Sequence, residues 1–267
     1  MRTFFIIAIA LISSTCYAQL AGNIDLTHWE LELPTGYKAA EWKLSNFQDD
    51  PFAKPFFYVD ESDQALVMVA YPAKGTSKAK YSQNRLRERI EPCDRDMNWS
   101  MKDGGELSAQ FQVTEMSYNP EQKRDRTLLF QIHGTTNDDI EAQFGLSKSV
   151  SVPLISVYWQ NDRIRVVRKV LKEAGANGAD LVDKNAWEND GGRYFPKKIA
   201  FEKSEIKITA SEGRVEVSLN GSKPIIYRDA SIRKWPFDNY FVAGNYLQTK
   251  QPGSRSVVKF YKLEVTH

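Results

Sequence analysis

The chain has 267 residues, with 36 Lys and Arg against 34 Asp and Glu and a formal net charge of +2. This near balance argues against a dedicated nucleic-acid surface, although it is compatible with a local basic groove. Beyond the first eighteen residues no segment reaches the ~18 consecutive apolar residues of a membrane-spanning helix, so we expect neither a nucleic-acid nor a membrane partner.

Residues 1–18, "MRTFFIIAIALISSTCYA", have the features of a cleaved signal peptide. A basic residue precedes a short apolar run, and the segment ends on small residues. We therefore expect a secreted protein, extracellular or periplasmic, with one mature domain over 19–267. A lipid anchor on Cys16 is an alternative, but the preceding serines and threonine make a poor lipobox. Removal of the peptide leaves Cys93 as the only cysteine, which predicts a fold without an intramolecular disulfide.

An arginine-rich strand is predicted at "YSQNRLRERIEP", residues 81–92. Its period-two face collects Gln83, Arg85, Arg87 and Arg89. Like charges side by side on a strand are costly unless an anion lies against them, so this face predicts an anionic ligand. A solvated edge strand, whose arginines deter aggregation, is the alternative interpretation.

Two hairpins and a long half-buried strand are predicted from alternation and turn residues. The segment "GELSAQFQVTEM" (105–116) alternates apolar and polar residues at period two. "SVYWQNDRIRVVRKV" (156–170) predicts a hairpin that turns at Asn161-Asp162, and "RVEVSLNGSKPIIYRD" predicts one that turns at Asn220-Gly221. These patterns favour an antiparallel, all-β fold.

A second polar pair interrupts the apolar strand "LLFQIHGTTND", residues 128–138. Gln131 and His133 are two apart and face together, while Phe130 and Ile132 face the opposite side. If the apolar side packs between two sheets, the polar pair lies on an outer, concave face where a polymer can bind. The alternative is a histidine that is hydrogen-bonded within the sheet and has no chemical role.

The remaining segments complete a single domain. Residues 172–192 are polar and glycine-rich and predict a loop with at most one helical turn. The last strand, "KFYKLEVTH", is predicted to place Tyr261, Leu263 and Val265 on one face. The sequence has no linker, low-complexity tract or fixed-period repeat, so we expect one sandwich of two packed antiparallel sheets.

The segment "YFVAGNYLQT" (240–249) carries a third period-two set: Tyr240, Val242, Gly244, Tyr246 and Gln248. Gly244 leaves room for a backbone or a ligand to approach closely. A tyrosine pair taken alone indicates only packing. Together with the arginine strand and the pair of Gln131 and His133, it indicates a functional site.

The opening "IDLTHWELELPTG", the arginine strand, "QIH" (131–133), "YFVAGNYLQ" and the closing "VVKFYKLEVTH" resemble, in order and position, the family seven polysaccharide lyases. These are the jelly-roll alginate lyases, and the resemblance spans the mature chain. It implies a β-jelly roll whose concave sheet binds an anionic polysaccharide, alginate, and cleaves it by β-elimination. It also implies that no metal or other cofactor is needed, and we expect a monomer.

Two positions depart from the family pattern. Its arginine motif usually reads Arg-x-Glu-x-Arg followed by Glu. In the register that we favour, Arg87 takes the second arginine, Arg85 replaces the glutamate and Gln83 replaces the first arginine. A shifted register would match Arg85 and Arg89 to the two arginines. Val242 stands where the family commonly has lysine. These departures concern subsite preference more than the elimination chemistry.

The resemblance implies roles for four catalytic residues. Gln131 and Arg87 would donate hydrogen bonds to the uronate carboxylate as C5 loses its proton, and such donors are typically worth ~3 kcal/mol each. His133 would accept the proton and Tyr246 would protonate the departing O4. The remaining motif residues would bind substrate: Gln83, Arg85, Arg89, Tyr240 and Gln248.

The division of labour depends on the sugar. In mannuronate the C5 proton and O4 lie on the same side of the ring, so Tyr246 could serve as both base and acid. In guluronate they lie on opposite sides, and His133 would be the base. The isoleucine of "QIH", Ile132, is associated in the family with guluronate-containing blocks.

Other functions are weighed against this one. A lyase for another polyuronate such as glucuronan would keep the chemistry, and a non-catalytic carbohydrate-binding jelly roll would keep only the cleft. Jelly-roll glucanases usually need a Glu-x-Asp-x-x-Glu strand, which the sequence lacks. No zinc site is expected from His28, His133 and His267. A structural calcium at the acids of "TTNDDIEA" is left open.

Overall fold

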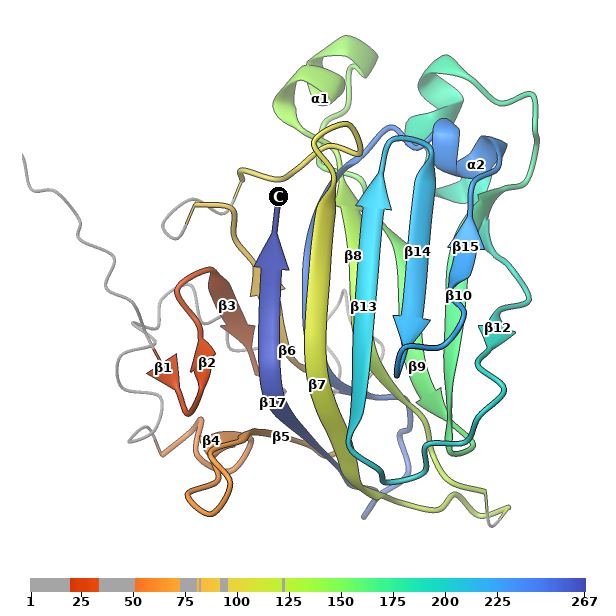
Figure 1. Ribbon diagram of the computed structural model, residues 1–267. Coiled ribbons are helices and arrows are strands. Elements are labelled where there is room, and N and C mark those ends of the chain that lie inside the picture. Colours follow the sequence, from red (N-terminus) through yellow and green to blue (C-terminus); the bar gives the residue numbers. More distant parts are fainter. Residues whose placement is uncertain (1–19, 34–50, 73–80, 82, 92–95, 122) are drawn as a thin grey trace, which may run out of the picture.

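The computed structural model describes residues 20–33, 51–72, 81, 83–91, 96–121 and 123–267. The expected signal peptide with Cys16, and Cys93, lie outside this part of the chain. The described residues form two large antiparallel sheets that pack face to face, with short helices gathered at one end (Figure 1). The predicted all-β sandwich is confirmed.

The larger sheet has eight strands within the described residues. Across the sheet they follow the order β11 (Trp187–Asn189), β10 (Arg163–Leu171), β9 (Ser151–Gln160), β8 (Thr127–Thr135), β16 (Asp238–Leu247), β6 (Gln83–Glu88) and β3 (Trp29–Glu32). The eighth, β12 (Arg193–Tyr194), also pairs with β10. The three segments singled out in the sequence thus become the adjacent strands β8, β16 and β6.

The smaller sheet has seven strands among the residues described. Their order is β15 (Ile225–Tyr227), β14 (Arg214–Leu219), β13 (Ser204–Ser211), β7 (Gly105–Met116), β17 (Ser256–Thr266), β5 (Leu66–Ala70) and β4 (Phe57–Val59). A two-stranded ribbon, β1 (Leu20–Ala21) and β2 (Ile24–Asp25), lies beside it. The chain therefore crosses between the sheets repeatedly, as a jelly roll requires.

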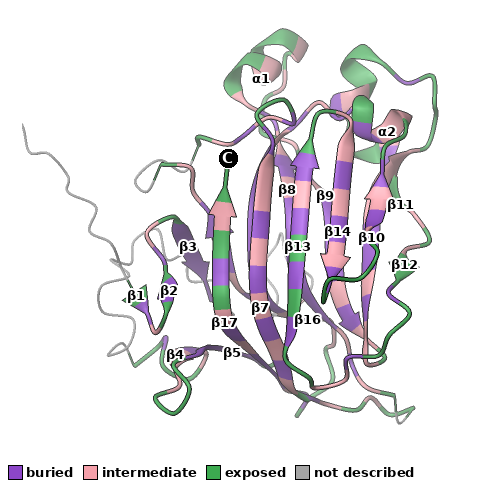
Figure 2. Ribbon diagram, in the orientation of Figure 1, coloured by how far each residue is buried: buried purple, intermediate pink, exposed green. Residues whose placement is uncertain are grey.

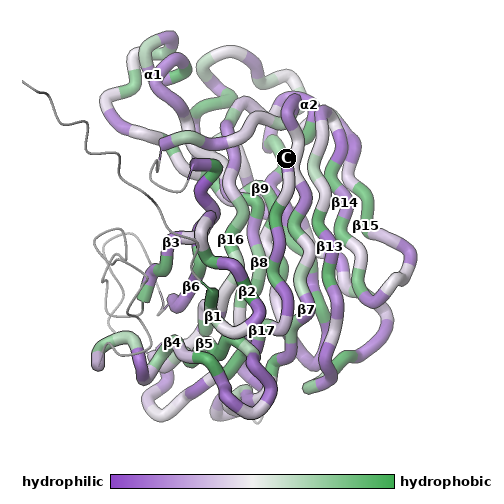
Figure 3. Tube along the Cα trace, turned by 60° about the vertical axis from the view of Figure 1, so that its left-hand side comes forward, coloured by the Kyte–Doolittle hydropathy of each residue, from purple (hydrophilic) through white to green (hydrophobic). Residues whose placement is uncertain are grey.

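The core lies between the two sheets, and strands such as β7 and β13 turn every second side chain into it. Hydrophilic and hydrophobic residues alternate along the strands (Figure 3), and buried residues alternate with partly exposed ones in β7 and β13 (Figure 2). Phe111, Phe130 and Phe260 meet edge to face there, with ring centroids 5.3 and 5.9 Å apart. Such pairs contribute about 1 kcal/mol each beyond the burial of their area. Phe130 fixes which face of β8 is turned inward.

Both predicted hairpins are confirmed. Strands β9 and β10 pair from Gln160 and Arg163 outward, and the turn residues Asn161 and Asp162 have φ of 53° and 62°. These positive values are those of a two-residue type I′ turn. Strands β14 and β15 also pair, but only from Val217 opposite Ile225, because Lys223 and Pro224 extend the connection after the Asn220-Gly221 turn.

The predicted face of the last strand is wrong at one residue. A β-bulge between Phe260 and Lys262 shifts the register of β17 against β7. Phe260 and Leu263 therefore point into the core, whereas the Tyr261 hydroxyl donates to Gln112 Oε1 on the outer face, at 2.8 Å. A bulge inserts one unpaired residue, so period two no longer predicts the faces on both sides of it.

The segment predicted as a loop, 172–192, holds more regular structure than expected: the 3₁₀ helices η3 (Gly178–Val182) and η4 (Lys184–Ala186), followed by β11. Asp183 caps η4 by accepting a 2.9 Å hydrogen bond from the Asn185 backbone N–H. Trp187 anchors the segment, since its indole N–H donates to the Leu181 carbonyl at 2.8 Å and its ring packs against Trp235.

Two short α-helices, α1 (Asp138–Phe144) and α2 (Ala230–Arg233), cover one end of the sandwich. The acids of "TTNDDIEA" fall in the first turn of α1, where their negative charges interact favourably with the positive end of the helix dipole. No group of three or more His, Cys, Asp or Glu in the described part of the chain is placed to hold a metal ion. Nor does any helix described there have the length and apolar character to cross a membrane.

Candidate active site

Strand register brings the three polar segments together on the face of the larger sheet that is turned away from the smaller one, here called the open face. Val242 of β16 lies opposite Arg87 of β6 on one side and opposite Gln131 of β8 on the other. One step along the strands, Tyr240 pairs with His133. Residues far apart in the sequence thus form one continuous surface.

The apolar partners of these residues explain why the polar ones face outward. Phe130 and Ile132 are completely buried in the core between the sheets, so Gln131 and His133 point to the open face. Leu86 is likewise buried in the core and turns Arg85 and Arg87 outward. Alternation alone therefore places the candidate site, as the sequence predicted for the two strands separately.

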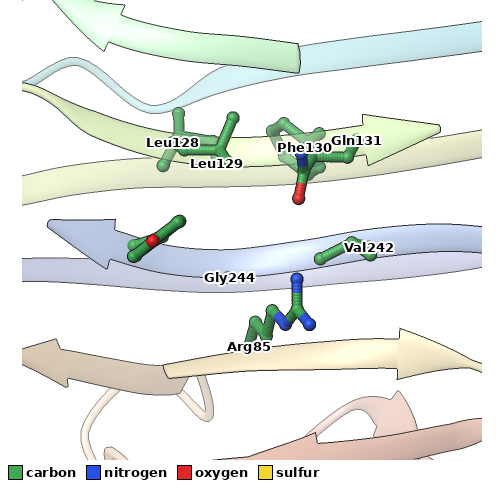
Figure 4. Close-up of a pocket in the computed structure, with 8 residues that line it drawn as sticks. Arg85, Leu128, Leu129, Phe130, Gln131, Val242 and Gly244 are labelled. Carbon is green, nitrogen blue, oxygen red and sulfur yellow. The ribbon is translucent and has the colours of Figure 1, made fainter. Parts of the chain in front are cut away.

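Gly244 allows β6 and β16 to approach each other closely beneath this surface. A Cβ at this position would lie 2.5 Å from the Asn84 carbonyl oxygen and 2.6 Å from the Arg85 Cα. Both contacts are too short for any side chain, so only glycine fits. A small hollow opens here, lined by Arg85, Leu128, Leu129, Phe130, Gln131, Val242, Gly244 and Tyr246 (Figure 4). Figure 4 shows the Arg85 guanidinium extended toward β16, with Gln131 on the neighbouring strand.

Two carboxylates that the sequence reasoning missed neutralise the arginine strand. Strand β3 lies beside β6 and places Glu32 opposite Arg85 and Glu30 opposite Arg87. Arg85 Nε donates to Glu32 Oε2 at 2.5 Å, and Arg89 forms a 3.0 Å ion pair with Glu30. The protein's own carboxylates therefore relieve part of the arginine charge that the sequence analysis left to an anionic ligand.

The same pairing fixes the charge and the direction of Arg85. Burial opposes its positive charge, but the Glu32 carboxylate outweighs burial and raises the pKa of Arg85. Glu32 also accepts a 3.2 Å hydrogen bond from the Gln83 amide. A buried ion pair of this kind holds both side chains in one geometry. Glu32 thus aligns two of the predicted substrate-binding residues.

Arg87 and His133 both contact the ring of Tyr240. The Arg87 guanidinium carbon lies 4.0 Å from the centre of that ring, and Arg87 Nη2 donates to Asn98 Oδ1 at 3.1 Å. His133 stacks on Tyr240 with centroids 5.1 Å apart and an interplanar angle of 16°. Tyr240 is only 8% exposed, so its ring supports its two neighbours more than it offers a surface of its own.

His133 is held as a neutral imidazole. Its Nδ1 lies 3.2 Å from the Gly134 carbonyl oxygen, an acceptor, so Nδ1 carries the proton and Nε2 keeps a lone pair. Burial lowers the pKa of His133 to about 3, and the positive charges of Arg85 and Arg87 act in the same direction. The side chain is half-buried on the open face and is not part of the hydrophobic core.

Tyr246 and Gln131 are oriented by their neighbours. The Tyr246 hydroxyl accepts a 3.3 Å hydrogen bond from the Tyr81 backbone N–H, and the two rings meet edge to face at 6.2 Å. Gln131 Nε2 donates to Ser156 Oγ at 3.2 Å. Gln248 lies just beyond β16, and its amide donates to the Tyr246 carbonyl at 3.3 Å. Gln248 thus braces the end of the strand.

The open face combines three kinds of chemical group. Gln131, Arg85 and Arg87 are hydrogen-bond donors suited to a carboxylate, His133 is a neutral proton acceptor, and Tyr246 is a phenol that can donate a proton. Donors that stabilise a carboxylate while a neighbouring base removes a proton are what an elimination next to a carboxylate needs. A glycoside hydrolase would instead need two carboxylates flanking the bond.

Comparison with known proteins agrees with this chemistry. The alginate lyase family model matches residues 24–267. Similar solved structures include family 7 alginate lyase A1-II′ with a product (GGG), at TM-score 0.69 and 22% identity over 94% of this chain and 100% of that one. The same enzyme with a substrate (GGMG) matches at TM-score 0.67 and 21% identity, over 92% and 95% of the two chains.

Alginate lyase PA1167 from Pseudomonas aeruginosa matches at TM-score 0.66 and 20% identity, over 91% of this chain and 99% of that one. No curated protein sequence gives a significant match. The structural likenesses confirm the jelly roll, and the family model covers almost the entire described chain. The chain therefore belongs to the alginate lyase family, polysaccharide lyase family 7.

Proposed function

We propose that the protein cleaves alginate by β-elimination on the open face of the larger sheet. The observation that carries the proposal is the neutral imidazole of His133, which lies on β8 near Gln131. Strand β16 separates these two residues from Arg87 on β6, and β16 itself carries Tyr246. Family membership and the substrate and product complexes of A1-II′ support the choice of polymer. The roles of single residues are part of the proposal.

The reaction begins with the carboxylate of the sugar whose C5–H bond breaks. Gln131 and Arg87 donate hydrogen bonds to that carboxylate and stabilise the charge that it gains as C5 is deprotonated. The electron pair of the C5–H bond forms the C4=C5 double bond, and the C4–O4 bond breaks. Tyr246 gives a proton to the departing O4. The products are a new reducing end and an unsaturated uronate.

The base depends on the configuration at C5. In guluronate, where the C5 proton and O4 lie on opposite sides of the ring, His133 Nε2 takes the proton. In mannuronate they lie on the same side, and Tyr246 reacts as its phenolate: it takes the C5 proton, becomes the phenol and passes that proton to O4. Arg85, held by Glu32 beside Gln131 and Tyr246, adds positive charge to the same hollow.

The direct test is to incubate purified protein with alginate, polymannuronate, polyguluronate and glucuronan. The absorbance of the C4=C5 product reports elimination and separates it from hydrolysis, which creates no double bond. We expect absorbance to rise with alginate and at least one of its two homopolymers. Turnover on glucuronan alone would identify a lyase for another polyuronate. Binding without any absorbance change would identify a carbohydrate-binding jelly roll.

Replacements of Arg87 and Arg89 are expected to differ in their effect on activity. Arg87 lies in the row of Gln131, whereas Arg89 lies beyond the end of β6 and pairs with Glu30. Arg87→Ala should therefore lower kcat/KM about a hundredfold, the loss typical of one transition-state donor, and Arg89→Ala less than about tenfold. Initial rates per folded molecule, with melting temperatures as the control, make the comparison. A larger loss in Arg89→Ala than in Arg87→Ala would favour the shifted register, in which Arg85 and Arg89 are the two arginines of the motif.

The low pKa of His133 predicts the acid limb of the pH profile. Because the folded-state pKa lies below the ordinary value, the imidazole keeps its acceptor lone pair as the pH falls through ~6.5. We expect kcat/KM on polyguluronate to show no ionisation of the free enzyme's base between about pH 5 and pH 7, with loss only as the pH approaches about 3. A midpoint near 6.5 that disappears in His133→Asn would contradict this assignment.

A further inference from the structure

The open face continues well beyond the candidate active site along a single row of paired residues. From Tyr246 on β16 the row passes through Leu128 on β8, Tyr158 on β9, Arg165 on β10 and Tyr194 on β12. Each pair is a direct cross-strand neighbour. Adjacent strands lie ~4.8 Å apart, so Tyr194 is roughly 19 Å from Tyr246 across the sheet.

The far end of this row is a hollow of about 340 Å³ lined by Asn161, Arg163, Tyr194 and Lys198. No acidic residue lines it. Arg163, Arg165 and Lys198 take part in no ion pair within the described part of the chain. The nearest acid in sequence, Asp162, is paired with Arg124 at 3.6 Å. Unlike the arginine strand, this cluster is balanced by no ion pair with a carboxylate among the described residues.

Arg165 is built rigidly into this cluster. Its guanidinium donates to Gln160 Oε1 at 3.2 Å and to the Gly191 carbonyl at 2.9 Å, and it lies 5.5 Å from the centre of the Tyr194 ring. A Cβ at Gly192 would lie 2.7 Å from Arg165 Nε, so the glycine lets the loop close over the arginine. Tyr194 itself is 40% exposed and offers a ring to a sugar.

We propose that Arg163, Arg165, Tyr194 and Lys198 form a distal subsite for a carboxylate-bearing sugar of the same polymer, several residues away from the bond that is cleaved. This proposal rests on the proposed function, since it takes the polyuronate as the ligand. A 4-linked sugar advances the chain by roughly one strand spacing, ~5 Å, so a chain of about four to five sugars laid across the strands reaches from Tyr246 to Tyr194. The cations would pair with carboxylates and Tyr194 would pack against a ring.

A subsite at this distance makes the same contacts in the ground state and in the transition state. It therefore lowers KM and leaves kcat unchanged, because uniform binding does not accelerate the chemical step. Its contribution should also be sensitive to salt, since the cations are near the surface. The KM of oligosaccharides that are too short to span the row should not depend on this subsite.

The test compares Arg163→Gln/Lys198→Gln, and Lys198→Gln alone, with Lys223→Gln. This control matches the single variant in charge and lies at an exposed residue of the β14–β15 connection on the other sheet. We expect KM for long alginate to rise about tenfold in the double variant, the effect of losing two exposed ion pairs, with kcat within about twofold. KM for a trisaccharide, and both constants of the control, should not change. Lys198→Gln alone, at an exposed position, should give a smaller rise without a folding defect.

A second arm keeps the outcome separate from the proposed function. In a Tyr246→Phe background, calorimetry measures the affinity for intact alginate with and without the double substitution, so no turnover is needed. Weaker polymer binding with unchanged trisaccharide binding supports the subsite even if the wild-type protein proved not to be a lyase. Unchanged polymer binding and KM, or an equal loss on trisaccharide, overturns it.

Discussion

Replacing Tyr246 with phenylalanine is expected to lower kcat at least about a hundredfold on both polymannuronate and polyguluronate. The substitution removes only the hydroxyl, which in the proposed mechanism is the acid toward O4 whichever face of C5 loses its proton. That hydroxyl accepts a hydrogen bond from the Tyr81 backbone N–H at 3.3 Å. Losing that bond should cost about 1 kcal/mol of stability at most, so the variant should fold.

The matched control is Tyr158→Phe, which removes a hydroxyl from the same row of the open face, two strands away. Initial rates from product absorbance should stay within about threefold of wild type there, since no acid or base is lost. Near-wild-type turnover of Tyr246→Phe on either homopolymer would show that another group protonates O4. Equal losses in the two variants would point to a general role of the row in binding.

Local features of the fold could be predicted from the sequence because they depend on neighbouring residues. The alternation of 105–116 became β7, and the Asn161-Asp162 dipeptide became a two-residue turn between β9 and β10. The face of Tyr261 could not be predicted, since the bulge beside it is set by pairing with β7. Period two predicts faces only where the ladder is regular.

The candidate site shows the same limit at longer range. The sequence predicted that Gln131 and His133 share one face and Arg85 and Arg87 another, and the fold placed these strands on either side of β16. It did not predict that Glu30 and Glu32 lie against the arginines, because β3 and β6 are some fifty residues apart. The period-two spacing in "WELEL" indicates that Glu30 and Glu32 share one face of a strand. The ion pairs with the arginines can be predicted only when β3 is known to lie beside β6.

These carboxylates change how the cleft recognises an anion. With Glu30 and Glu32 each held by arginines, the positive charge near the hollow is largely balanced within the protein. In the proposed function, specific donors such as Gln131, Arg85 and Arg87 would then select the carboxylate by geometry. In the described part of the chain, Arg163, Arg165 and Lys198 form no ion pair, and they lie at the far end of the row, near Tyr194. Attraction of the polymer and chemistry on it would thus be carried by different parts of one sheet.

The substitution His133→Asn tests whether the imidazole is the base for guluronate. Asparagine can keep a hydrogen bond to the Gly134 carbonyl, which His133 Nδ1 contacts at 3.2 Å, but it has no basic lone pair for a proton. We expect kcat on polyguluronate to fall about a hundredfold or more, the range for loss of a general base. On polymannuronate the fall should be smaller, because in the proposed mechanism Tyr246 takes the C5 proton there.

The same variant separates catalysis from folding. His133 lies on the open face, so its replacement leaves few hydrogen-bonding groups without a partner. Within the described residues, the substitution alters the stacking of His133 on Tyr240 and its contacts with Gly134 and Ser151, so the melting temperature should stay within a few degrees, about 1 kcal/mol. His28→Asn, the same change at an exposed histidine outside the site, should leave both rates within about twofold. If His133→Asn unfolded the protein while its folded fraction cleaved polyguluronate normally, the histidine would be a structural residue of the sheet and another group would be the base.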